Sequence, residues 1–271
     1  MEERLLDPEL RIAVVGEASS GKSTLINAFL RRRLLPSSVL ITTRTTMTLR
    51  HGHGTEGLSL VTADGQVLTW PSAQFARFAG AGSADLATAL RSVLVTDRAN
   101  HLRRLEVWCP TRVIGDQVTI IDTPGFSVDE AGHRELAAAA IEAADLVIVV
   151  IPAVATTSLT TMQFLAETTR RHRDRCTFVI TKTDLVEDGE LAEVLTLTRS
   201  CLVRAGFSDP VVLTCAPEPT LRESARPGAF LAQFEAMEQR LTTLAAHGRR
   251  RAPPRCLAGE PRQPGGRCGG R

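Results

Sequence analysis

Residues 16–23 read GEASSGKS, which matches G-x-x-x-x-G-K-[ST], the pattern of a loop that binds nucleotide phosphates. In such a loop the backbone N–H groups surround the phosphates, and the following helix adds the positive end of its dipole. Lys22 is expected to contact the β- and γ-phosphates, and the Ser23 hydroxyl is expected to bind Mg²⁺. The expected phosphate-binding residues are Gly16, Ser19, Ser20, Gly21, Lys22, Ser23 and Thr24.

The loop has the sequence setting that this chemistry needs. An apolar run at residues 11–15 predicts a buried strand before the loop, and residues 24–33 predict a helix after it. A glycine-rich turn without a ligand is the alternative. We favour the nucleotide site because three further motifs follow in the order that such a site requires.

The second informative stretch is Asp122-Thr123-Pro124-Gly125, which follows the predicted strand at residues 117–121. An aspartate at a strand end near a phosphate-binding loop typically holds Mg²⁺ through a water molecule. The N–H of Gly125 could reach an oxygen of a γ-phosphate. A simple Pro-Gly turn is the alternative interpretation.

A third motif, Thr181-Lys182-Thr183-Asp184, follows the predicted strand at residues 177–180 and concerns the base. The Asp184 carboxylate can accept two hydrogen bonds from guanine N1–H and its exocyclic amine, whereas adenine offers no matching pair of donors. Lys182 can lay its alkyl stem along the base, so the motif favours GTP over ATP.

Two weaker signals complete the set. Cys215 and Ala216 follow the predicted strand at residues 210–213, in the place of the last guanine-contacting loop, and an ordinary loop explains them equally well. The stretch LITTRTT at residues 40–46 offers a threonine hydroxyl that would complete the Mg²⁺ shell when a γ-phosphate is present. The candidates for that hydroxyl are Thr42, Thr43, Thr45 and Thr46.

Strand and helix patterns alternate along the chain around these motifs. Residues 58–68 alternate apolar and polar side chains around Asp64-Gly65, which predicts a hairpin. Strands are also predicted at 105–109 and 146–151, and helices at 71–97 (broken at 80–82), 133–144, 159–173, 191–205 and 229–246. This order predicts an α/β, three-layer P-loop NTPase fold with a mainly parallel sheet covered by helices on both faces. All the motifs would then meet at the carboxyl ends of the strands.

The composition is ordinary for a globular protein, with 43% hydrophobic and 23% charged residues. No apolar run approaches the roughly 20 residues that span a bilayer, and the first ten residues lack the apolar core of a signal peptide. We therefore expect a cytoplasmic location. The six cysteines are scattered without a CxxC pair, so neither a zinc site nor a disulfide framework is expected.

The last part of the chain differs from the rest. Residues 249–271 hold seven arginines against the single acidic Glu260, whereas the net charge of the whole chain is only +2. Their content of Pro, Gly and Arg, with one large aliphatic residue, predicts disorder. A basic arm that contacts an anionic membrane or a nucleic acid is the alternative. Residues 1–248 are the expected folded domain.

With these residues in place, the chain resembles the GTPase domain of bacterial dynamin-like proteins over residues 10–247. The run SSGKS at residues 19–23 and the run LLPSSVLITT at residues 34–43 are similar to family signatures, and TKTD stands where most small GTPases have NKxD. The gap between Thr43 and Asp122 is far longer than in Ras-like GTPases, and the hairpin and helices inside it resemble the dynamin insertion.

The resemblance implies a mechanism. It assigns catalysis to Ser19, Lys22, Thr43 and Gly125, with Thr43 as the switch threonine beside Ser23 and Asp122 around Mg²⁺. Ser19 would help to place a K⁺ ion that replaces an arginine finger. Residue 126 is Phe, where Ras-like proteins have a water-positioning Gln. Hydrolysis is therefore expected to be slow in the monomer and faster in a transient, nucleotide-dependent homodimer.

The chain also departs from the family. The family's long helical stalk has no counterpart after the helix at 229–246, and the composition of the tail would suit an out-of-frame reading of a GC-rich gene, which would make the chain a truncated product. Contact with a membrane, at its inner face, is expected only if another chain supplies a stalk. Two functions stay open: a dynamin-like GTP hydrolase, and an Era-like switch that binds RNA or another partner. The acidic body and the lack of an appended RNA-binding module argue against nucleic acid.

Overall fold

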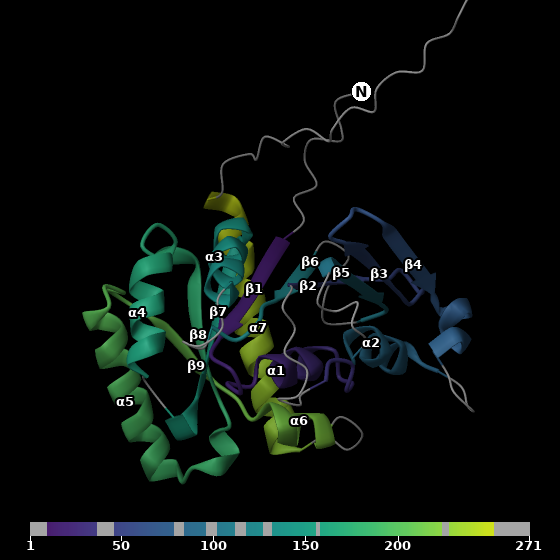
Figure 1. The fold of residues 1–271 in the computed structure, drawn as a ribbon. Coiled ribbons are helices and arrows are strands. Elements are labelled where there is room, and N and C mark those ends of the chain that lie inside the picture. Colours follow the sequence, from purple (N-terminus) through teal and green to yellow (C-terminus); the bar gives the residue numbers. More distant parts are fainter. Residues whose placement is uncertain are drawn as a thin grey trace, which may run out of the picture.

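A nine-stranded sheet runs through the protein in the order β4-β3-β5-β2-β6-β1-β7-β8-β9 (Figure 1). The computed structural model describes residues 10–36, 46–78, 84–95, 102–111, 118–126, 132–155, 158–223 and 228–251, with side chains to residue 244. The strands are β1 Leu10–Gly16, β2 Met47–His51, β3 Gly57–Thr62, β4 Val67–Pro71, β5 Leu102–Cys109, β6 Val118–Asp122, β7 Leu146–Pro152, β8 Cys176–Thr181 and β9 Val211–Thr214.

The sheet is mainly parallel, as predicted. The strands β6, β1, β7, β8 and β9 all run parallel to their neighbours in that half of the sheet. The other half is mixed, because β2 is antiparallel to β6 but parallel to β5, and β3 is antiparallel to both β4 and β5. The hairpin predicted around Asp64-Gly65 is β3–β4, and Gly65 has the positive φ of 86° that its turn requires.

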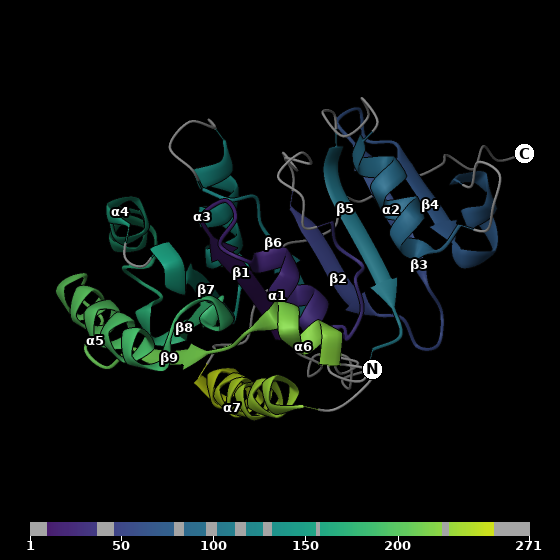
Figure 2. The same ribbon diagram turned by 90° about the horizontal axis from the view of Figure 1, so that it is seen from below.

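Helices cover both faces of the sheet (Figure 2). They are α1 Lys22–Phe29, α2 Leu86–Val95, α3 His133–Ala143, α4 Leu159–Thr168, α5 Asp188–Arg204, α6 Pro217–Glu223 and α7 Ala229–Arg251, with short 3-10 turns at η2 Ser72–Phe78, η4 Ala153–Ala155, η5 Arg173–Arg175 and η6 Thr183–Leu185. The core on one face contains residues of α1, α2 and α7, and the core on the other contains residues of α3, α4 and α5. This is the three-layer arrangement that the alternating pattern predicts.

Strand β1 shows how the apolar run at residues 11–15 serves both layers. Side chains alternate across a strand, so Val14 packs into the core under α1 while Ala13 and Val15 pack into the core under α3. All three are fully buried. A strand that is apolar on both faces reads as a continuous hydrophobic run, which is why the sequence predicts its position well.

Several helix ends differ from the predicted ones. Helix α1 begins at Lys22 and ends at Phe29, because Gly21 and Arg31 take left-handed φ values of 98° and 52°. Helix α4 ends at Thr168, short of residue 173, and the Thr169 hydroxyl bonds back to the Leu165 carbonyl at 2.6 Å. Helix α7 continues to Arg251, beyond the predicted end at 246; residues 252–271 of the predicted tail lie outside the described residues.

Strand β2 and helix α6 were not predicted. Strand β2 carries only two buried apolar side chains, Met47 and Leu49, which is too short an alternation to stand out. Helix α6 contains Pro217 and Pro219, residues that usually read as a loop. Prolines are tolerated there because the first turn of a helix has no intrahelical acceptor for its N–H groups.

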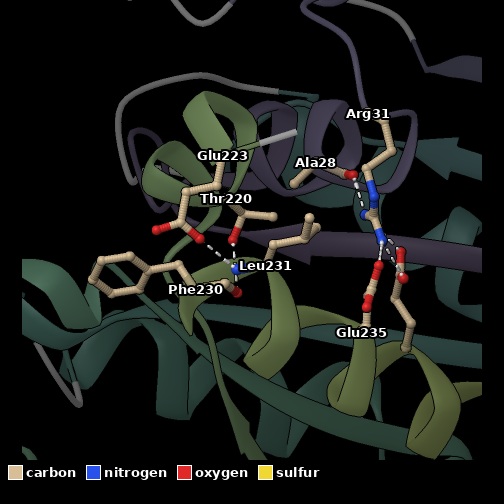
Figure 3. A network of polar contacts seen from close by, with 8 residues as sticks. Ala28, Arg31, Thr220, Glu223, Phe230, Leu231 and Glu235 are labelled. Atoms are coloured by element: carbon tan, nitrogen blue, oxygen red, sulfur yellow. Dashed lines mark hydrogen bonds and ion pairs between the residues drawn. The ribbon is translucent and has the colours of Figure 1, made fainter. Parts of the chain in front are cut away.

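Helix α7 is joined to α1 and α6 by polar contacts (Figure 3). The Arg31 guanidinium donates to both oxygens of Glu238 at 3.0 and 2.6 Å, lies 3.8 Å from Glu235, and stands over the Phe234 ring. The Glu223 carboxylate accepts a bond of 2.8 Å from the backbone N–H of Leu231 at the start of α7. Arg31 follows the end of α1 and also donates to the Ala28 carbonyl of that helix at 2.6 Å, so it links the helix after the phosphate-binding loop to the last described helix.

We expect Arg31→Met to lower the free energy of unfolding by about 2–3 kcal/mol, as for a buried ion pair that loses one partner. Methionine keeps an apolar stem near Phe234 but leaves Glu238, whose side chain is only 12% exposed, without its guanidinium. Burial raises the pKa of Glu238, and Arg31 opposes that shift.

Urea unfolding of the wild type and of Arg31→Met measures this loss of free energy of unfolding. The matched control is Arg33→Met, whose pair with Glu218 has side chains 54% and 39% exposed, and it should cost less than about 1 kcal/mol. Equal losses for the two variants would show that the Arg31 contact does not anchor α7.

Candidate nucleotide-binding site

The phosphate-binding loop connects β1 to α1 as predicted. At Gly16 and Gly21 the surrounding atoms or the backbone conformation require glycine. A Cβ on Gly16 would lie 2.6 Å from the Val150 carbonyl oxygen and 2.7 Å from Ser20 Oγ. Gly21 has a φ of 98°, and Ser19 is also left-handed at 58°. These turns bring the chain sharply round so that α1 begins at Lys22, with its free N–H groups at the loop.

Lys22 lies inside the loop rather than in solvent. Its Nζ donates to the carbonyl oxygens of Gly16 at 2.9 Å and Glu17 at 2.7 Å, and the residue is only 7% exposed. Burial lowers the pKa of Lys22 to about 8, and the charges of Asp122 and Glu17 oppose that shift. The ammonium group is thus a buried positive charge at the position where phosphate charge is expected.

Asp122 faces this charge from the end of β6. The register between β1 and β6 sets Asp122 beside Val14, and the Thr123 hydroxyl donates to the Val14 carbonyl at 2.9 Å. Asp122 is 8% exposed, and its Oδ1 has no hydrogen-bond partner among the described residues. Burial raises the pKa of Asp122 to about 6, and Lys22 opposes the rise.

Such buried oxygens without partners are rare and call for an explanation. Ser20 Oγ, in the loop itself, is a second one. A hydrated Mg²⁺ ion and a phosphate chain would supply what the two atoms lack, because carboxylate and hydroxyl oxygens are ligands for hard cations and their waters. The donor set therefore fits a magnesium nucleotide.

Gly125 lies directly against the loop. A Cβ at this position would stand 2.5 Å from the backbone nitrogen of Ala18, so only glycine fits. The Gly125 carbonyl oxygen is 3.2 Å from His133 Nδ1 at the start of α3.

The next residue, Phe126, points away from the site. Its ring is fully buried and stacks on Phe164 of α4, with centroids 4.0 Å apart. Its backbone N–H donates to the Gly16 carbonyl at 3.4 Å. The Phe126 side chain packs in the core. The water that attacks the phosphate must therefore be oriented by other groups, as the residue type predicts.

The loops predicted to select the base, after β8 and β9, lie on the other side of the phosphate-binding loop. The Thr181 hydroxyl donates to the Ser20 carbonyl at 2.6 Å, and a Cβ on Gly21 would stand 3.2 Å from the same hydroxyl. Lys182 is left-handed with a φ of 59°, and Asp184 is exposed. Thr181 thus holds the TKTD motif and the phosphate-binding loop together.

Cys215 and Ala216 are buried next to this loop. The Cys215 N–H donates to the Ile180 carbonyl at 2.9 Å. Burial raises the pKa of the Cys215 thiol, and the nearby negative charge of Asp184 adds to the rise. Cys215 therefore lies near Asp184, and Ala216 follows it in the chain.

The structure brings together most of the predicted residues. Those at the carboxyl ends of β1, β6, β8 and β9 form one edge of the sheet: Gly16, Ser19, Ser20, Gly21, Lys22, Ser23, Thr24, Asp122, Gly125, Thr181, Lys182, Asp184, Cys215 and Ala216. Thr43 lies outside the described residues, as do Thr42 and Thr45, whereas Thr46 is described just before β2. Among the described residues, no helix has the length and apolar character to cross a bilayer.

Sequence reasoning missed the residues that brace the loop. Glu17 accepts hydrogen bonds from Ser158 and Thr161 at the start of α4, and His133 contacts Gly125. The serine before the predicted helix at 159–173 is a typical N-cap, which was a readable signal. Nothing in the sequence, however, pairs it with a residue 141 positions earlier.

Comparisons with known proteins agree with this geometry. The model of the Dynamin family matches residues 12–183. Dynamin-like protein 2 of Campylobacter jejuni subsp. jejuni serotype O:23/36 (strain 81-176) is 27% identical over 129 residues, which cover 46% of this chain and 18% of that protein.

Two solved chains of an oligomerised bacterial dynamin pair, reported as a mechanism for long-range sensing and tethering of membranes, share the fold. Their TM-scores are 0.68 and 0.64, at 17% and 16% identity; each match covers 92% of this chain and 41% or 48% of the other. The chain thus spans less than half of the length of each relative. The match of a family model over well over half of the chain shows that this chain belongs to the dynamin family and carries its GTPase domain.

Proposed function

We propose that this chain binds GTP with Mg²⁺ and hydrolyses it to GDP and phosphate. The phosphates would lie along the backbone N–H groups of residues 16–24, with Lys22 on the β- and γ-phosphates. Ser23 and Thr43 would bind the metal directly, and Asp122 would bind it through water. The ion would neutralise charge on the transferred phosphoryl group.

The observation that carries the proposal is the buried pair Lys22 and Asp122. Both groups incur a desolvation cost in the nucleotide-free protein, as their opposite pKa shifts indicate. Such costs concentrate at sites where a ligand completes the electrostatics. Two unpartnered buried oxygens in the same place, on Asp122 and Ser20, support the same conclusion.

Selection of guanine is the second part of the proposal. Asp184 is exposed beside the base-selecting loop, where its carboxylate can accept from guanine N1–H and the exocyclic amine. Lys182 has a left-handed backbone with a φ of 59°, and its alkyl stem would lie along the base. The backbone around this motif is held by the Thr181 hydroxyl, which donates to the Ser20 carbonyl, and by the Cys215 N–H, which donates to the Ile180 carbonyl.

The attacking water needs an orienting group other than residue 126. We propose that the backbone of Gly125, the Thr43 region and a K⁺ ion near Ser19 position it, with full activity reached in a transient homodimer of the domain. The exposed Ser19, held left-handed at the mouth of the loop, supports this placement. Residues 1–248 form the working unit in this proposal, in the cytoplasm, with any membrane contact at the inner face made through other segments.

GTP turnover per molecule, measured against protein concentration in K⁺ and in Na⁺ buffer, tests the proposal. We expect a rate per molecule that rises with concentration and falls when Na⁺ replaces K⁺. The blank is Lys22→Ala. A rate that stays flat with concentration would reject activation by pairing and favour a slow, Era-like switch. A wild-type rate equal to the blank would reject hydrolysis itself.

A further inference from the structure

The Glu17 side chain ties the phosphate-binding loop to helix α4. We propose that Glu17 is a positioning residue: through its contacts with Ser158 and Thr161 it holds the loop in the shape that binds nucleotide. The inference rests on the proposed function, because the property that it explains is the affinity for a guanine nucleotide.

The side chain of Glu17 is held by the first turn of α4. Its Oε1 accepts hydrogen bonds from the hydroxyls of Ser158 and Thr161, the latter at 2.8 Å. Ser158 Oγ is at the same time the N-cap of α4 and accepts from the Thr161 N–H at 3.0 Å. The start of a helix also favours a negative charge through its dipole. The Glu17 carboxylate is therefore stabilised both by the two hydroxyl donors and by the dipole of α4.

The main chain of Glu17 holds the loop from the inside. Its carbonyl oxygen accepts from Lys22 Nζ at 2.7 Å and from the Ser20 N–H at 3.3 Å. A Cβ on Gly125 would lie only 3.0 Å from the Glu17 carbonyl carbon, so the peptide after Glu17 also packs against the DTPG motif. One residue thus joins α4, Lys22 and Gly125.

Movement of the side chain would therefore move the carbonyl that holds Lys22. With the tie intact, the loop is fixed before the nucleotide arrives, and binding does not have to order it. Without these contacts of Glu17, residues 16–19 gain conformational freedom, which nucleotide binding must then remove. The expected consequence is weaker binding of nucleotide.

Thr161→Val removes this contact, together with the 3.1 Å contact between the Ser158 and Thr161 hydroxyls. Valine has nearly the same shape, Thr161 is 5% exposed, and the exchange removes one hydroxyl that donates to a carboxylate. We expect the dissociation constant for mant-GDP to rise on the order of tenfold, as for the loss of a charge-assisted hydrogen bond. Glu17→Ala should weaken mant-GDP binding as well.

The decisive readout is the double-mutant cycle in mant-GDP affinity. In a Glu17→Ala background, adding Thr161→Val should change the dissociation constant less than twofold, because the acceptor is already gone. The matched control is Thr169→Val, at the other end of α4, where a fully buried hydroxyl donates to the Leu165 carbonyl at 2.6 Å. It should lower the melting temperature but leave mant-GDP affinity unchanged.

The possible results separate the two claims. If Thr161→Val lowers only the melting temperature, or if its effect adds fully to that of Glu17→Ala, the positioning role of Glu17 is wrong while the nucleotide site stands. A wild-type chain that does not bind mant-GDP at all would overturn the proposed function, and this inference with it.

Discussion

Replacing Lys22 with alanine should lower GTP turnover at least ~100-fold, since one preorganised charge at a phosphoryl-transfer site contributes on the order of several kcal/mol to the transition state. Alanine removes the positive charge that would face the β- and γ-phosphates. The effect should exceed that of any surface charge, because Lys22 is 7% exposed and its field is weakly screened. Steady-state release of phosphate measures the loss.

The nucleotide-free form of Lys22→Ala should remain folded. Burial lowers the pKa of Lys22 to about 8, so the fold stabilises the neutral amine relative to the ammonium; removing the group removes this desolvation cost, which offsets the loss of its attraction to Asp122. A melting temperature close to that of the wild type, together with lost turnover, is the expected pair of results. If turnover survived in the folded variant, the assignment of residues 16–23 to phosphate binding would be wrong.

The second large effect is expected at Asp122. Asp122→Asn should weaken the dependence of GTP binding on Mg²⁺, with the metal affinity falling on the order of 10–100-fold, and, in the nucleotide-free protein at pH 7.5, raise the free energy of unfolding by about 1–2 kcal/mol. The carboxylate is buried with an unpartnered Oδ1, and asparagine removes that negative charge. Binding of mant-GTP with and without Mg²⁺, and urea unfolding without nucleotide, measure the two effects.

The sign of the pH dependence follows from the pKa of Asp122, which rises from the ordinary 3.8 to about 6 in the fold. A raised pKa means that the folded state binds the proton more tightly, so this group's stabilising contribution is full below about pH 4 and is lost as pH rises through about 6. The advantage of Asp122→Asn over the wild type should therefore be largest above pH 6 and vanish near pH 4.

Asp85→Asn is the control, because the pKa of Asp85 is lowered in the fold whereas that of Asp122 is raised. The exposed Asp85 accepts from the Thr88 N–H at 2.8 Å, and its contacts with Thr88 lower its pKa, so asparagine should cost a little stability or none. If Asp122→Asn proved less stable than the wild type at pH 7.5, the buried carboxylate would have a structural role that the magnesium site does not explain.

The sequence predicts the half of the fold that surrounds the nucleotide better than the other half. Strands β1, β7 and β8 are buried on both faces, so each appears as an uninterrupted apolar run. Strand β2 lies in the mixed half and is recognisable only by its partners, because its register with β5 and β6 is set by contacts far along the chain. Long-range pairing of this kind leaves no local signal.

The same distinction holds for the candidate site. Motif residues such as Lys22 and Asp122 are readable because their spacing from strand ends is local. The contacts that brace them, from Ser158 to Glu17 and from Thr181 to Ser20, join residues that are 141 and 161 positions apart. The contact of Arg31 with Glu238 of α7 spans 207 positions, and the sequence does not predict it either.

The burial of Lys22 has a consequence for chemical labelling. The chain contains only two lysines, Lys22 and Lys182, and all its other basic residues apart from histidine are arginines. Both lysines belong to the candidate site; in the proposed complex one would lie under the phosphates and the other beside the base. Reagents that acylate side-chain amines therefore have no bystander targets in this protein. The extent of their reaction is a direct footprint of site occupancy.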